Sequence, residues 1–402
     1  MIQETLRKGF VLGAGLLLSI SSFAQKGIAF ETGTFAQVLE KSKQTGKPIF
    51  MDAYTTWCGP CKAMARSVFT NDTVAAYYNK NFVCYKSDME KGEGLDLAKK
   101  YEVRAYPNLL YISAEGNILH RVAGFRNASD FVKLGQTALN PDARFEAIKK
   151  QYEAASNEAA KASAYMLALA DAALPYEKVS ENYFNSITET EFTTPSNWEI
   201  IKNLEENLNS KVFQYFIKNR DKYASLYGKE SVEKRINQVY LQALERTVER
   251  TPEAYDKLFA EYSALNLAKD KETDMTLIQL ELVVLKHKQN WAKYDEVASN
   301  LVSKYISKNA YALNSIAWDA YEHISDAKVM AKAEQWAASS CKISPEYANL
   351  DTYACILFKN GKSALAKKTA QEAIAKGKKA GEDTAETEAL LAKINDKLKV
   401  KK

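Results

Sequence analysis

Trp57-Cys58-Gly59-Pro60-Cys61 is the stretch of the chain that says most about its fold and chemistry. It directly follows a short apolar run of strand character and opens a segment with helical periodicity. Both sulfurs are therefore expected at a helix N-terminus, where unpaired N–H groups favour a thiolate. The spacing lets the second thiol reach a mixed disulfide formed by the first. The motif predicts a redox-active cysteine pair.

Helical and strand-like segments alternate around this motif. Thr34 and Gln37 have capping-box spacing ahead of a first helix. A turn at Glu115-Gly116-Asn117 separates two strand-like runs and makes them antiparallel. Apolar runs and strand-forming residues predict strands at 49–54, 81–86, 109–112 and 118–123. Helical periodicity predicts helices at 61–69 and 129–139. The pattern predicts one mixed α/β unit that ends near residue 140.

This region, residues 27–140, resembles the thioredoxin superfamily, and three features besides the cysteine motif carry the resemblance. Asp52 lies six residues before Cys58 on the expected central strand, where thioredoxins keep a buried carboxylate. Tyr106-Pro107 stands where the family has a cis proline, and Gly124 follows the last strand, where the family has a glycine beside its substrate groove. The resemblance implies an α/β thioredoxin-like domain over residues 25–140.

Roles for the site residues follow from the same resemblance. Cys58, expected to be the more exposed sulfur, is the attacking nucleophile, Cys61 is the resolving thiol, and Asp52 acts as general base and acid. The expected substrate surface consists of Trp57, Gly59, Pro60, Tyr106, Pro107 and Gly124. No cofactor is implied, and no metal site is expected, because no second paired-cysteine motif or histidine cluster could complete four zinc ligands.

Some positions depart from the usual thioredoxin pattern. Arg66 stands where thioredoxins usually carry a proline. At this position and at residues 69–72, the chain is more similar to the C-terminal domain of the membrane reductase that delivers electrons to the bacterial periplasm. Cys84 lies near the position at which thioredoxins have a buried lysine. In that family the lysine pairs with the buried carboxylate that corresponds to Asp52. Alternation puts Lys86 on the same strand face, as a substitute for that lysine. Cys84 itself is expected to be a buried free thiol.

The N-terminus predicts export. Arg7 and Lys8 precede an apolar run at 10–20, and Ser22-Phe23-Ala24 places small residues where a signal peptidase reads them. The run is shorter than the roughly 20 residues that a membrane span needs. We expect a signal peptide at 1–24 and cleavage after Ala24. The mature protein is then expected to be soluble and periplasmic, without a stable membrane span.

After Pro141 the sequence changes to long helical segments, which predict an all-α helical-repeat domain, an α-solenoid, over residues 141–398. An offset of 37 residues aligns four pairs, namely Leu313 with Leu350, Ala317 with Ala354, Ala333 with Ala370 and Ala338 with Ala375. Small residues at matching places on successive helices suit stacked helical hairpins. The segment 310–380 therefore resembles a pair of tetratricopeptide-like repeats. Five aromatic residues upstream are expected to be the buried stripe of amphipathic helices: Trp198, Tyr215, Phe216, Tyr223 and Tyr227.

The remaining cysteines and histidines give no second site. On antiparallel helices Cys341 and Cys355 would be displaced by roughly 9 Å, beyond the limit of about 7 Å for a disulfide, so both are expected to be core thiols. The histidines His120, His287 and His323 are scattered and are interpreted as surface or packing residues. The formal charge is +5, and no dense block of Lys and Arg is present. The sequence therefore does not predict binding of nucleic acid.

Together these features favour an exported thiol-disulfide oxidoreductase that acts on protein disulfides. A reductase is preferred, since Gly-Pro between the cysteines is found in reducing thioredoxins. Its expected partners are protein thiols and disulfides, a membrane electron donor, and a protein partner on the helical domain. Two alternatives stay open: a disulfide isomerase, and a helical-repeat binding protein with a regulatory thioredoxin-like module.

Overall fold

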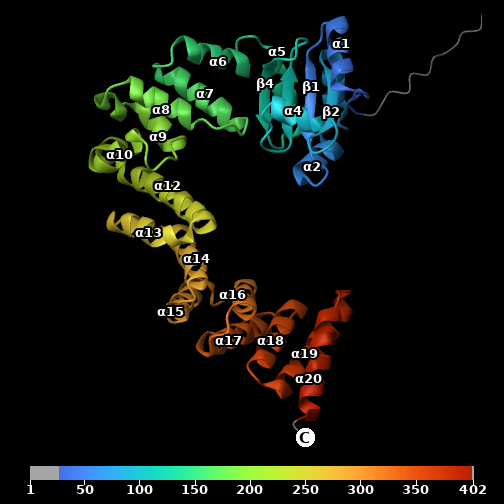
Figure 1. Ribbon diagram of the computed structural model, residues 1–402, viewed down its shortest axis with the longest axis vertical. Helices are drawn as coiled ribbons and strands as arrows, with labels where there is room; N and C mark the ends of the chain where they lie inside the picture. Colours follow the sequence, from blue (N-terminus) through green and yellow to red (C-terminus); the bar gives the residue numbers. More distant parts are fainter. Residues whose placement is uncertain (1–26, 401–402) are drawn as a thin grey trace, which may run out of the picture. The chain divides into compact units, whose positions relative to one another are not determined.

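The computed structural model describes residues 27–400, which form two compact units, 27–205 and 206–400 (Figure 1). The expected signal peptide, residues 1–24, lies outside the described residues. The expected domain boundary between residues 140 and 141 lies inside the first unit, which continues through four more helices. That boundary stays a prediction.

A four-stranded sheet forms the centre of the first unit. Its strands are β1 (Ile49–Tyr54), β2 (Val83–Asp88), β3 (Asn108–Ile112) and β4 (Ile118–Ala123), in the order β2-β1-β3-β4. β1 runs parallel to β2 and antiparallel to β3, and β4 is antiparallel to β3. β1 is an interior strand, which explains why its first five residues are all buried and why its sequence is a continuous apolar run broken only by Asp52. The predicted α/β thioredoxin-like fold is confirmed.

Helices cover both faces of this sheet. One face carries α2 (Gly59–Ser67), α3 (Asp72–Asn81) and α5 (Ala128–Leu139), and the other carries α1 (Phe35–Thr45) and α4 (Gly94–Lys100). Phe50 of β1 points into the first layer and Met51 into the second, because successive side chains of a strand alternate between faces. Thr34 and Gln37 form the predicted capping box of α1. Helices α3 and α4 were missing from the sequence-based expectation.

A group of aromatic side chains joins α3, α5 and the sheet. The rings of Tyr78 and Phe131 stack at 4.1 Å between centroids. The hydroxyl of Tyr78 donates to the backbone carbonyl of Phe131 at 2.7 Å, so it accepts the hydroxyl of Tyr111 at 2.6 Å. Both buried hydroxyls are therefore satisfied, which removes the cost of burying them.

The first unit continues with α6 (Phe145–Ala154), α7 (Ala159–Asp171), α8 (Glu177–Ser186), a 3₁₀ turn (Glu189–Thr193) and α9 (Pro195–Asn203). No side chain of its own caps the start of α6. Instead, the backbone N–H of Phe145 donates to Nδ1 of His120 on β4 at 3.1 Å. A terminal N–H of the helix thus finds its partner on the sheet, and α6 is fixed against β4.

The second unit is helical throughout its described residues. Its helices are α10 (Lys211–Lys218), α11 (Arg220–Tyr227), α12 (Lys229–Arg250), α13 (Tyr255–Ala264), α14 (Lys271–His287), α15 (Trp291–Leu301), α16 (Ala310–His323), α17 (Ala327–Ile343), α18 (Tyr347–Lys359), α19 (Ser363–Ala380) and α20 (Ala385–Val400). A 3₁₀ turn (Pro252–Ala254) precedes α13, and a π-helical turn (Val302–Ile306) follows α15. Among the described residues, no helix combines the length and the apolar character needed to cross a bilayer.

The repeat alignment places matching residues on α16 to α19. The first three aligned pairs are buried on both sides, whereas Ala338 is half-buried and Ala375 is exposed. The fourth pair therefore does not pack as a repeat would require, since its two positions face outward from the helix core. The repeat interpretation itself stays a prediction.

Two other expectations about side-chain burial need correction. Of the aromatic stripe, Trp198, Phe216 and Tyr223 are buried, but Tyr215 and Tyr227 are only half-buried. Cys355 is a buried free thiol. Cys341 was also expected in the core, but it is half-buried, and its thiol donates to the carbonyl of Asn349 at 3.1 Å near the end of α17.

Candidate active site

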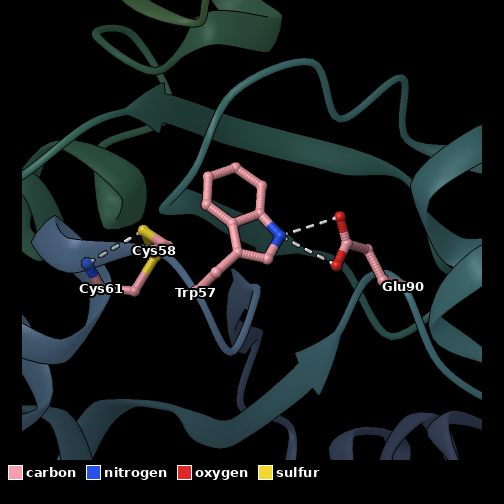
Figure 2. The surroundings of a disulfide bond; sticks show 4 residues. All are labelled: Trp57, Cys58, Cys61 and Glu90. Atoms are coloured by element: carbon pink, nitrogen blue, oxygen red, sulfur yellow. Dashed lines mark hydrogen bonds between the residues drawn. A yellow bond between two sulfur atoms is a disulfide. The ribbon is translucent and has the colours of Figure 1, made fainter. Parts of the chain in front are cut away.

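The cysteine pair lies where β1 turns into α2. Cys58 is the N-cap residue of α2 and Cys61 lies in its first turn, and their sulfurs form a disulfide with Cα atoms 5.3 Å apart. The backbone N–H of Cys61 donates to Sγ of Cys58 at 3.1 Å (Figure 2). Pro60 fits this turn because its missing N–H would have no helical partner there. After reduction, the same N–H group and the helix dipole favour a thiolate on Cys58.

Exposure does not distinguish the two sulfurs. Cys58 was expected to be the more exposed cysteine, but it exposes 3% of its surface and Cys61 exposes 5%. The expectation was wrong, because the side chain of Cys58 folds back over the first turn of the helix as an N-cap does. The exposed residues of the motif are Trp57, Gly59 and Pro60. The difference between the sulfurs is the hydrogen bond that only Cys58 accepts from the helix start.

Trp57 stands beside the disulfide and is 65% exposed. Its indole N–H points between both carboxylate oxygens of Glu90, at 3.1 and 3.0 Å (Figure 2). The ring of Tyr106 meets the indole edge to face, with centroids 6.0 Å apart. Glu90 thus orients the aromatic rim of the site. Glu90 could not be found by sequence analysis, because it lies 33 residues after Trp57 in the loop that follows β2.

The loop before β3 completes the rim. The Tyr106–Pro107 peptide bond is cis, as the resemblance implied. The backbone N–H of Gly124 donates to the carbonyl of Pro107 at 2.8 Å, and Gly124 has φ of +89°, a conformation that favours glycine. The sequence-based substrate surface is therefore brought together from three loops, although its role in binding stays a prediction.

Asp52 is buried under the cysteine pair. One of its carboxylate oxygens, Oδ1, has no hydrogen-bond partner among the described residues. Burial raises the pKa of Asp52 from 3.8 to about 7, and the positive charge of Lys86 opposes part of that rise. Asp52 and Cys61 line the same cavity of about 420 Å³. The carboxyl group can therefore hold or release a proton close to Cys61 near neutral pH.

Lys86 and Cys84 occupy the positions that departed from the thioredoxin pattern. Lys86 lies opposite Asp52 in the register of the neighbouring strands β1 and β2. Its side chain is exposed, with Nζ 5.6 Å from the centre of the Phe30 ring. Cys84 is buried and free, as expected, and its burial raises its thiol pKa far above the usual range. Cys84 is therefore unsuited to thiol exchange.

Among the described residues, no group of three or more His, Cys, Asp or Glu side chains could hold a metal ion. The site has a disulfide at a helix start, a cis proline before β3 and a buried carboxyl group with a raised pKa. On a thioredoxin-like sheet, these features define the class of thiol-disulfide oxidoreductases.

Comparisons with known proteins agree with this class. The family described as the thioredoxin-like domain matches residues 35–139. Thioredoxin-1 of Drosophila melanogaster is 34% identical over 84 residues, which are 21% of this chain and 70% of that protein. The chain therefore belongs to the thioredoxin superfamily through its N-terminal domain.

Other similar proteins also match less than a third of this chain. Thiol:disulfide interchange protein DsbD of Yersinia pestis is 32% identical over 92 residues, which are 22% of this chain. The match spans 15% of the length of that relative. A solution structure from Bacteroides thetaiotaomicron, described as a candidate disulphide-isomerase, is 43% identical and covers 29% of this chain and 95% of its own, with a TM-score of 0.27.

Proposed function

We propose that this protein is an exported enzyme that reduces protein disulfides through Cys58 and Cys61. One observation carries the proposal: the N–H of Cys61 donates to Sγ of Cys58 at the start of α2. A thiolate on Cys58 would be stabilised there by a hydrogen bond and by the helix dipole. Export is supported by the sequence of residues 1–24, and reduction by the Gly-Pro pair between the cysteines.

The reaction proceeds in two exchanges. The Cys58 thiolate attacks a substrate disulfide, forms a mixed disulfide and expels one substrate thiolate, which takes a proton. Asp52 then accepts the proton of the Cys61 thiol. The Cys61 thiolate attacks Sγ of Cys58, which restores the Cys58–Cys61 disulfide and releases the second substrate thiolate. The substrate gains two electrons and the cysteine pair loses them. A reductant of the thiol class must then regenerate the pair.

Trapping of substrates tests the assignment of the two cysteines. In the Cys61→Ser variant, mixed disulfides should accumulate on Cys58, because the resolving thiol is absent. The Cys58→Ser variant is the matched control and should trap few or no substrates. Mass spectrometry of the trapped complexes identifies the partners. Equal trapping by both variants would contradict the roles proposed here.

The direction of electron flow needs a separate measurement. Reduction potentials in this fold run from about −270 mV for reductants to about −120 mV for strong oxidants. We expect the potential of this pair near the reducing end, together with efficient reduction of a protein disulfide. Refolding of a substrate with scrambled disulfides distinguishes the isomerase alternative, because a reductase gives reduced chains and an isomerase gives native pairs.

A further inference from the structure

A cavity of about 290 Å³ lies in the first unit, away from the cysteine pair, where α6 and α7 meet the edge of the thioredoxin-like domain. Most of its lining is apolar or aromatic: Tyr101, Ile118, Phe145, Tyr165, Leu169, Leu174 and Pro175. Its charged lining residues are three cations, Lys100, Arg121 and Lys149, and one carboxylate, Glu102. The cavity thus combines apolar and aromatic side chains with an excess of positive charge.

Arg121 on β4 is the unusual member of this lining. It exposes only 5% of its surface. Its Nη2 donates to the backbone carbonyl of Glu102 at 3.2 Å, and its Nε–H has no hydrogen-bond partner among the described residues. No carboxylate of the described chain lies within ion-pair distance of its guanidinium group. The charge of Glu102 offsets part of the cost of burying this cation, but from beyond ion-pair distance, so an anion in direct contact with Arg121 would be stabilised.

The neighbouring charged residues make their contacts elsewhere and form no ion pair with Arg121 among the described residues. The carboxylate of Glu102 lies 3.7 Å from Arg104, and this contact is largely exposed. Lys149 approaches Glu153 at 3.7 Å with both side chains about half exposed, a pair that contributes little. Lys100 holds its Nζ over the Tyr101 ring, 5.0 Å from the ring centre. Of the charged lining residues, only Glu102 offsets part of the positive charge, and it lies beyond ion-pair distance of Arg121.

We propose that this cavity binds a small organic carboxylate with an apolar or aromatic body. The carboxylate would pair with the guanidinium of Arg121, whose planar fork matches its two oxygens, and with the ammonium of Lys149. The body would lie against the rings of Phe145 and Tyr165. A cavity of about 290 Å³ is at the small end of ligand sites, which limits the ligand to a compact molecule.

Calorimetric titration of the full chain with benzoate tests the proposal. Benzamide, which has the same ring without the charge, and inorganic phosphate, which has charge without a ring, are the two comparison probes. We expect benzoate to bind with a Kd of about 1 mM or tighter, and each comparison probe at least about tenfold more weakly. Absence of benzoate binding would overturn the proposal. Phosphate binding as tight as that of benzoate would overturn the apolar part of it.

Substitutions locate the site. Lys149→Gln should weaken benzoate binding about threefold, because an ion pair of a half-exposed lysine is worth less than about 1 kcal/mol. The matched control is Lys150→Gln, because Lys150 is outside the cavity and contacts Glu146 at 2.7 Å. Arg121→Lys keeps the positive charge but removes the planar guanidinium group that can donate two parallel hydrogen bonds, so it should also weaken benzoate binding. Equal losses in the variants of Lys149 and Lys150 would show that binding occurs elsewhere. Circular dichroism confirms that each variant is folded.

Discussion

At the scale of single residues, the most informative group is the buried carboxyl of Asp52. Its pKa in the folded protein, about 7, lies above its ordinary value of 3.8. The folded state therefore binds the proton more tightly than the unfolded state. Binding of this proton contributes up to about 4 kcal/mol to the free energy of unfolding. The contribution is present in acid and is lost as the pH rises through about 7.

Asp52→Asn should therefore stabilise the oxidised protein above pH 7 and have little effect near pH 4. Guanidinium denaturation of both proteins at pH 4.5 and pH 8 measures the difference in free energy of unfolding. Asp142→Asn is the control, since Asp142 is exposed in the loop after α5. A difference that does not change with pH would mean that Asp52 does not titrate in this range. The same variant should slow resolution of mixed disulfides by Cys61.

The contact between Trp57 and Glu90 gives a second prediction at this scale. Glu90→Ala should lower kcat/KM for a protein disulfide about fivefold, because the lost hydrogen bond is exposed and worth about 1 kcal/mol. Glu90→Gln keeps an acceptor for the indole N–H and should retain most of the activity. Assays with a small aromatic disulfide provide the comparison, because it does not extend along the rim. An equal loss for both substrates would argue against a role in binding.

At the scale of helices and strands, the sequence predicted those elements whose signals are local. The apolar run of β1 and the capping box of α1 needed no knowledge of the rest of the chain. Helix α3 also has a local signal, since Asn71 caps it by accepting the N–H groups of Thr73 and Val74. Its buried face is short, with Tyr78 as its largest side chain, so periodicity alone was too weak to predict it.

The contacts that complete the site come from distant parts of the chain. Trp57 meets Glu90 only because β1 and β2 are neighbours in the sheet. The burial that raises the pKa of Asp52 likewise depends on packing around β1. The chemical motif, the cis proline and Lys86 opposite Asp52 could be predicted from the sequence, whereas the contact of Trp57 with Glu90 could not.

The hydroxyl pair of Tyr78 and Tyr111 allows a test of packing between elements. Tyr78→Phe removes the group that accepts from Tyr111 and donates to Phe131, and should cost about 1–3 kcal/mol of unfolding free energy. The double variant with Tyr111→Phe should cost less than the sum of the single changes, because no hydroxyl is then left without a partner. Denaturation of the four proteins gives this coupling energy. Strict additivity would contradict the hydrogen bond.

At the scale of the molecule, helices α6 to α9 are part of the same compact unit as the thioredoxin-like domain. A chain of residues 27–140 would expose the side of β4 where Phe145 and His120 meet. It should be less stable than residues 27–205 by about 2 kcal/mol, the value of burying one large apolar side chain. Denaturation midpoints measure this difference. Identical midpoints would mean that α6 adds nothing to the domain.

Phe145→Ala in residues 27–205 is the matched control for that comparison. It removes the buried ring but keeps α6 and the backbone hydrogen bond to His120, so it should account for part of the loss. A variant at the exposed Phe125 should change stability little.

The three cysteines outside the motif have a practical consequence for studies in cells. Burial suppresses ionisation of Cys84, and it raises the pKa of both Cys341 and Cys355 to about 12. At neutral pH these thiols are poor nucleophiles towards alkylating reagents. Mass tagging of the native protein therefore reports on the motif alone: a reduced molecule is tagged there, at Cys58 first, and an oxidised molecule carries no tag.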